Sequence, residues 1–227
     1  MARLSGSVLG NLSGKLGNLA ARTKNGETIL SARPSSFNAS QAPAMVAIRQ
    51  KFSVSVQVAK VVNGIDDLNK IWDKVRLPGT SAYNTIVQKN FQYSDVQRPT
   101  VQNIITPGGF NLATTFSGVA ADSVAVDLAA LNAQTNFSAD EKDLSLSILL
   151  VGYEPVNADD DYYKIWSFNY TNQNYIPANT LEVVVDLDQF HQNDLARYTK
   201  KVLLVSAATK DANGKIIQYS STFGNEF

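Results

Sequence analysis

Short apolar runs, rich in Val, Ile and Tyr and bounded by Gly, Pro, Asn or Asp, recur along the chain after about residue 100. Runs of this length and composition are typical of β-strands, and their close spacing favours antiparallel sheets packed as a sandwich. A short helix over 188–197 is expected to interrupt the series, and Asp211-Ala-Asn213-Gly214 to form a hairpin connection before the last strand. The candidate strands cover 110–116, 123–129, 144–153, 162–169, 180–187, 200–208 and 214–220.

These runs predict an α+β or mainly β protein in which residues 101–227 form an antiparallel β-sandwich of immunoglobulin-like outline. Only the general architecture is predicted, since the Cys pair and central Trp of antibody domains are absent. A helical segment at 41–100 is expected before the sandwich, and residues 1–40 are expected to form a basic, Gly-rich arm with a β-hairpin. The sequence leaves open whether the helices pack on the sandwich or form a separate layer.

The segment 41–63 carries two overlapping apolar patterns. Its apolar residues recur at helical spacing, whereas 52–58 also alternates with polar residues as a strand does. The length of the segment favours a helix, as do Pro43 near its first turn and Gly64 as a C-terminal cap.

Two shorter helices are expected after it, at 66–75 and at about 80–92, separated by Leu77-Pro78-Gly79. Asp, Thr and Ser side chains commonly cap helix N-termini by accepting a hydrogen bond from the first turn. The candidate caps are Asp66 or Asp67 for the first helix and Thr80 or Ser81 for the second.

The first 40 residues cannot build a core of their own. Residues 1–17 contain four glycines, each of which would cost a free helix roughly 1 kcal/mol, so an extended or irregular segment is expected. Asn25-Gly26 is a strong hairpin signal and predicts strands at 19–24 and 27–33. A lone hairpin is marginal in water, so we expect it to pair with a neighbouring subunit or a sheet edge.

Charge is unevenly distributed in a chain whose formal net charge is zero. Residues 1–64 carry eight Lys/Arg and one acid, a net charge of +7, so the remaining residues carry −7. This separation favours an acidic partner for the basic end, which the acidic body of an identical neighbour would provide. Nucleic acid is disfavoured, because Phe37 is the arm's only aromatic. The expected subunit-interface residues are Lys15, Arg22, Lys24, Asn25, Gly26 and Arg33.

Residues for catalysis or for binding a metal or cofactor are scarce. The chain has no Cys and a single histidine, His191, which is more often a surface or helix-end residue than a base. Gly10-Asn-Leu-Ser-Gly14-Lys15 lacks the spacing of a phosphate loop, and no Gly-x-Ser-x-Gly elbow is present. Asp159-Asp160-Asp161 lacks the alternation of a calcium loop. We therefore expect no enzyme activity, no cofactor and no metal.

The Tyr-rich stretch 162–175 has two interpretations: an exposed contact surface, which with Trp166 would suit a sugar, or filling of the sandwich. No run of about 20 apolar residues is long enough to span a membrane. The stretch after Arg3 is too polar and Gly-rich for the core of a signal peptide, so we expect a soluble intracellular product.

Short motifs near the N-terminus resemble a known family. Gly10-Asn-Leu-Ser-Gly14-Lys15-Leu-Gly17-Asn18 is followed by Asn25-Gly26, Arg33-Pro34, Gln41 and Arg49-Gln-Lys-Phe52. Over residues 6–52 the chain resembles an uncharacterised protein family of Bacteroidota and their phages and prophages. The C-terminal region is similar only in general character. The resemblance implies a virion structural protein of crAss-like tailed phages, assembled in the host bacterial cytoplasm, and it carries over no catalytic or binding residues.

The leading hypothesis is a neck or tail ring subunit that forms head-to-tail homo-oligomers through its N-terminal arm and contacts other virion proteins. An auxiliary or decorating protein of the phage head is the second hypothesis. A carbohydrate-binding module or adhesin that uses residues 162–175 is the third, and an enzyme is the least favoured class.

Overall fold

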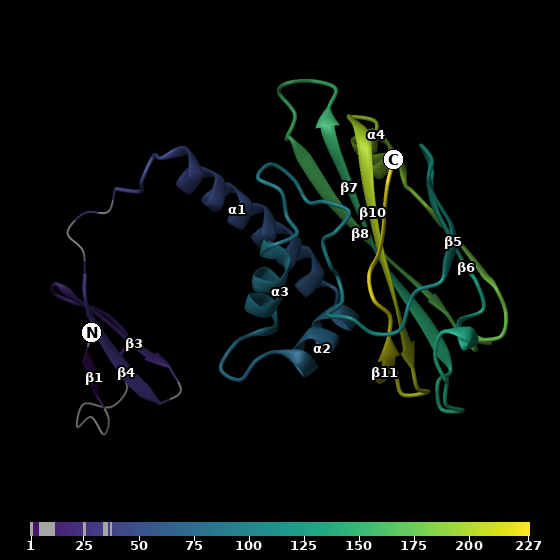
Figure 1. Ribbon diagram of the computed structural model, residues 1–227, viewed down its shortest axis with the longest axis horizontal. Helices are drawn as coiled ribbons and strands as arrows, with labels where there is room; N and C mark the ends of the chain where they lie inside the picture. The colour runs from purple at the N-terminus through teal and green to yellow at the C-terminus, as the bar shows by residue number, and fades with distance from the viewer. Residues whose placement is uncertain (1, 5–11, 25, 34–35, 37) are drawn as a thin grey trace. The chain divides into compact units, whose positions relative to one another are not determined.

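The computed structural model of the chain describes residues 2–4, 12–24, 26–33, 36 and 38–227 (Figure 1). Its contacts divide the chain into two compact units, Met1–Val46 and Ala47–Phe227. Among the described residues, no helix is long and apolar enough to cross a membrane.

The first unit contains a four-stranded antiparallel sheet in the order β1-β4-β3-β2. The predicted hairpin is confirmed, since Lys24 pairs with Glu27 and Gly26 has a φ of +80° in the connection; Asn25 lies outside the described residues. Two further strands, which the sequence pattern does not predict, pair with the outer edges of the hairpin, so both hairpin edges are occupied by the same chain. The strands are β1 (Ala2–Leu4), β2 (Gly14–Leu16), β3 (Leu19–Lys24) and β4 (Glu27–Ala32).

All predicted helices are confirmed: α1 (Pro43–Gly64), α2 (Asp66–Val75), α3 (Ala82–Phe91) and α4 (Gln189–Leu195). Ser81 caps α3 by accepting a hydrogen bond from the Asn84 N–H, and Asp188 caps α4 in the same way through the His191 N–H. The predicted cap of α2 is wrong, because Ile65 holds the N-cap position. Asp66 and Asp67 lie instead in the first turn, where carboxylates favour the positive end of the helix dipole.

The second unit has two antiparallel sheets. In the larger sheet, β10 lies at the centre and pairs with β7, β11 and β12, while β8 pairs with the other edge of β7. In the smaller sheet, the order is β5-β6-β9. The strands are β5 (Thr114–Val119), β6 (Ser123–Leu128), β7 (Asp143–Pro155), β8 (Tyr163–Asn172), β9 (Leu181–Asp186), β10 (Tyr198–Lys210), β11 (Ile216–Tyr219) and β12 (Phe223–Glu226).

The predicted strand at 110–116 is misplaced. Phe110 forms only an isolated bridge with Ser220, and β5 begins at Thr114. Gly108 and Gly109, with φ of +140° and +115°, turn the chain just before this point. The last strand, β12, is also absent from the sequence prediction.

Strands β7 and β10 are buried on both faces and therefore separate two cores. Leu149 and Val151 face a core that includes Val58 and Trp72 from the helices. The alternate residues, such as Leu150, face a second core shared with β6 and β9. The second unit thus has three layers, with α1, α2 and α3 on one face of the large sheet and β5, β6 and β9 on the other (Figure 1). The helices pack on the sheet, which resolves the point that the sequence leaves open.

Candidate functional site

The predicted interface residues lie on or beside the sheet of the first unit. Lys15 and Arg22 are exposed on β2 and β3, and Arg33 is exposed directly after β4. Gly26 lies in the hairpin turn, and Lys24 ends β3. The structure therefore brings these residues into one small sheet, while Asn25 lies outside the described residues.

The strand register places Lys15 and Arg22 on the same face. Lys15 pairs with Ala20, and Arg22 pairs with Ile29, so all four share one side of the pleat. No ion pair among the described residues involves Lys15, Arg22 or Arg33. We call Lys15, Ala20, Arg22 and Ile29 the basic face. Glu27, whose strand partner is Lys24, lies on the same side at the turn.

The opposite face of this sheet carries small and apolar side chains, yet it forms almost no core. Ala21 and Thr28 are the only buried residues of the first unit among those whose burial is described. Leu19 remains 37% exposed, and the Thr23 hydroxyl is satisfied by donating to the Leu12 carbonyl at 3.1 Å. A small sheet with so little buried apolar surface is marginal by itself.

A surface of opposite charge lies on the smaller sheet of the second unit. The inner residues of β6 and β9, such as Val126 and Val183, are buried against the large sheet. Side chains alternate along a strand, so the intervening residues point outward. The outer surface, which we call the acidic face, comprises Phe116, Ala125, Asp127, Glu182, Val184 and Asp186.

The acidic face has no compensating cation. Neither β5, β6 nor β9 contains a Lys or Arg, and no ion pair among the described residues involves Asp127, Glu182 or Asp186. Asp127 pairs directly with Glu182 across the strands, an arrangement in which like charges are destabilising. Two apolar side chains are exposed between these acids: Phe116 is 54% and Val184 is 57% exposed.

Sequence reasoning missed the acidic face. The signal was present in each strand, because Asp127 and Glu182 stand at polar positions of alternating apolar runs. Their meeting depends on the pairing of β6 with β9, and these strands are far apart in the sequence.

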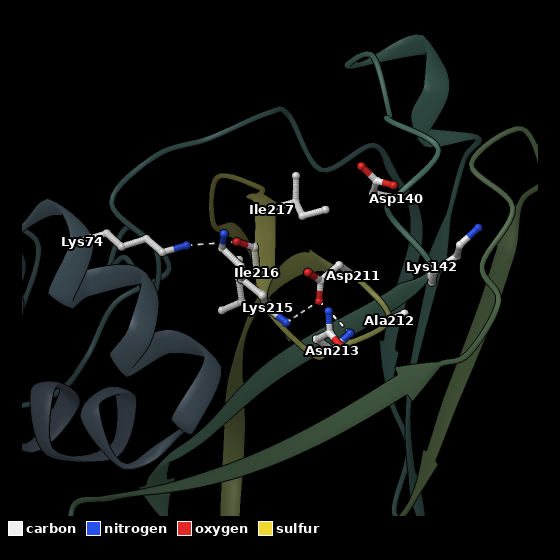
Figure 2. A pocket seen from close by; sticks show the side chains of 9 residues that line it. All are labelled: Lys74, Asp140, Lys142, Asp211, Ala212, Asn213, Lys215, Ile216 and Ile217. Atoms are coloured by element: carbon white, nitrogen blue, oxygen red, sulfur yellow. Dashed lines mark hydrogen bonds between the residues drawn. The ribbon is translucent and has the colours of Figure 1, made fainter.

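A surface pocket of about 670 Å³ is lined by Lys74, Lys215 and Asp211, among others (Figure 2). Two of its charged side chains form hydrogen bonds with backbone groups of the β10–β11 hairpin. Lys74 donates to the Ile216 carbonyl at 3.0 Å, and Asp211 accepts the Lys215 backbone N–H at 2.8 Å, which closes the β10–β11 turn. Figure 2 shows the Lys142 ammonium directed away from the other lysines. The lysines therefore do not converge on a common ligand position.

An apolar groove of about 940 Å³ runs between α1 and α3. Ile48 and Phe52 line it and are 49% and 52% exposed. Its rim is basic, since the Lys51 ammonium lies 5.4 Å from the centre of the Phe91 ring and donates to the Gln92 carbonyl.

The contacts of His191 are those of a residue that stabilises the start of α4. Its Nδ1 lies 2.7 Å from Asp188 Oδ1, and its ring packs edge-on against Phe168 and Phe190. The hydrogen bonds from the backbone and side chain of His191 lower the pKa of Asp188. No group of three or more His, Asp or Glu side chains within the described part of the chain is placed to hold a metal ion.

The Tyr-rich stretch 162–175 is divided between core and surface. Trp166 is only 7% exposed and packs edge-on against Tyr198, and Tyr175 is also buried. Tyr162 is 44% exposed. Trp166 therefore fills the second core and does not present a ring face to solvent.

The comparisons with known proteins add little to this geometry. No protein-family model matches the chain, and no curated protein matches it. Among solved structures, a β-glucosidase from Kluyveromyces marxianus is similar at a TM-score of 0.23 and 11% identity, over 60% of this chain and 16% of that one. The same enzyme in complex with glucose gives a TM-score of 0.22 and 12% identity, over 66% of this chain and 19% of that one. The chain thus spans less than a fifth of the enzyme, and these likenesses are too slight to assign it to a family.

Proposed function

We propose that the protein is a non-enzymatic structural subunit of a phage virion, which forms a head-to-tail ring in the neck or tail through its N-terminal unit. The N-terminal motifs that resemble a phage and prophage family support the virion context. A contact between different surfaces of identical subunits closes into a ring when the rotation between them allows it.

The charge and burial of the first unit carry this proposal. Met1–Val46 holds five Lys/Arg and one Glu, a net charge of +4, so Ala47–Phe227 carries −4. The described side chains of the first unit bury almost nothing, which leaves its sheet in need of a further contact surface. An identical subunit offers the opposite charge.

The structure changes the mode of contact that the sequence suggests. Strands β3 and β4 of the hairpin already pair with β2 and β1, so the hairpin itself has no free edge to add to a neighbour. In the proposed assembly the first unit binds through a face of its sheet. Side-chain contacts, and not main-chain hydrogen bonds, then determine the affinity and specificity of binding.

We also propose that the two facing sheets of the second unit follow an immunoglobulin-like arrangement. Both sheets are antiparallel, and their inner residues share one core, which supports a sandwich. Nuclear Overhauser contacts that pair β6 with strands other than β5 and β9 would contradict this assignment.

Deletion of residues 1–40 tests the assembly role. The full chain is expected to form a defined oligomer in size-exclusion chromatography with light scattering. The truncated chain is expected to be a folded monomer whose β-sheet circular dichroism signal falls only by the share of the four deleted strands, β1 to β4. An oligomer of unchanged size after truncation would refute the proposal. Copy number in purified virions separates the ring from a head decorating protein, since about a dozen copies favour the ring and hundreds favour the head.

A further inference from the structure

We propose that the acidic face of β5, β6 and β9 in one copy of the chain is the docking surface for the basic face of the N-terminal sheet of a second copy. In this contact, Asp127, Glu182 and Asp186 would pair with Lys15 and Arg22 of the neighbour. The inference rests on the proposed function and identifies the surface that receives the N-terminal unit.

Electrostatic complementarity is the first argument. The acidic face places Asp127 opposite Glu182 without a Lys or Arg on any of its three strands. The basic face holds Lys15 and Arg22 without an ion-pair partner among the described residues. The acidic face therefore carries a like-charge repulsion that the cations of the basic face would relieve, which favours specific association.

Both faces also carry apolar side chains that could pack against each other. Phe116 and Val184 are more than half exposed on the acidic face. The basic face carries Ala20 and Ile29 between its cations. Burial of exposed apolar side chains within a charged rim is typical of protein–protein interfaces.

The apolar groove between α1 and α3 is a poorer receptor for the same unit. The Lys51 ammonium lies beside it over the Phe91 ring, so a basic sheet docked there would meet like charge. The acidic face, in contrast, has the sign opposite to that of the basic face.

The proposed ring assembly makes a second copy the occupant of this surface. The acidic face belongs to the smaller sheet, on the side of the large sheet opposite to α1, α2 and α3. A neighbouring copy can present its N-terminal sheet there directly, and this contact joins two different surfaces, as a head-to-tail ring requires.

Charge reversal in the full chain tests this docking surface. Glu182→Lys with Asp186→Lys should weaken self-association at least tenfold, measured by sedimentation velocity over a concentration series. Lys15→Glu with Arg22→Glu should weaken it to a similar extent. When all four substitutions are combined in one chain, the ion pairs are restored with reversed sign, and assembly should return.

A matched control reverses two exposed acids elsewhere in the second unit. Asp140→Lys with Asp159→Lys makes the same change in net charge away from the acidic face, and assembly should remain. Circular dichroism of every variant shows whether the fold is kept.

The outcomes separate this inference from the proposed function. If the chain lacking residues 1–40 is monomeric but the acidic-face variant assembles normally, the docking surface is wrong and the assembly role stands. If both assemble normally, both are wrong. If the full chain is monomeric at all concentrations, contact between copies is refuted altogether.

Discussion

The Arg98 guanidinium lies over the Tyr153 ring, 3.8 Å from the ring centroid. The same guanidinium donates to Glu226 Oε1 at 3.2 Å, and the Tyr153 hydroxyl donates to that oxygen as well. Arg98 thus fastens the segment after α3 to β7 and to the last strand, β12. These contacts hold the end of the chain on the large sheet.

Substitution of Arg98 by Met should lower the free energy of unfolding by about 1 kcal/mol, because a partly shielded cation–π contact is lost with the ion pair. Urea unfolding monitored by tryptophan fluorescence measures the change. Lys70→Met removes an exposed ion pair with Asp66 and should change the free energy of unfolding much less than Arg98→Met does, because solvent screens the exposed pair. Equal effects of the two substitutions would show that the Arg98 contacts add nothing.

Alkaline pH should destabilise the protein through Tyr153. Burial, together with its hydrogen bond to Glu226, raises the pKa of Tyr153 to about 12. An unfolded tyrosine ionises near pH 10, so the stability linked to this group is complete below about pH 10 and is lost as pH rises through 12. Tyr153→Phe should lose less stability over this range in denaturant titrations. Parallel curves for the two proteins would contradict the assignment.

Acidic pH should act through Asp194. The hydrogen bond from Lys164 lowers the pKa of Asp194, whose side chain is only 7% exposed. A lowered carboxyl pKa adds stability above the unfolded value of about 4, and this contribution disappears as pH falls through the folded-state pKa. Asp194→Asn and Lys164→Met should each remove this pH-dependent part of the unfolding free energy. The prediction fails if either variant keeps the acid dependence of the parent chain.

Two adjacent glycines make a matched pair of substitutions. Both Gly108 and Gly109 have positive φ, so alanine is strained at either site and should cost about 1 kcal/mol. A Cβ at Gly109 would also collide with the Tyr219 carbonyl, whereas a Cβ at Gly108 meets open space. Gly109→Ala should therefore destabilise by about 2 kcal/mol more than Gly108→Ala in thermal or urea unfolding. Similar losses at the two sites would show that the backbone adjusts easily.

Local signals were enough to predict most elements from the sequence. The bounds of α2 are those predicted at 66–75, because Gly64 and Leu77-Pro78-Gly79 punctuate an amphipathic segment. The hairpin follows from the turn chemistry of Gly26. These features depend on residues that are neighbours in sequence.

Features that depend on tertiary pairing could not be predicted in this way. Strands β1 and β2 are three residues long, too short for a periodic pattern, and exist by pairing with the hairpin. Strand β12 likewise forms against β10. The acidic face requires β9 to lie beside β6, which no local signal encodes. The basic face was predicted as a set of charges, but the side of the sheet on which they lie follows only from the register.

The burial of β7 and β10 on both faces has a consequence for how the second unit comes apart. The same two strands line the core under the helices and the core under the smaller sheet. Neither outer layer therefore has a hydrophobic core that is independent of β7 and β10. Loss of either outer layer would expose one side of both strands to water and weaken the packing of the remaining outer layer on them. Ala47–Phe227 is therefore expected to melt in a single cooperative transition, with helices and both sheets lost together.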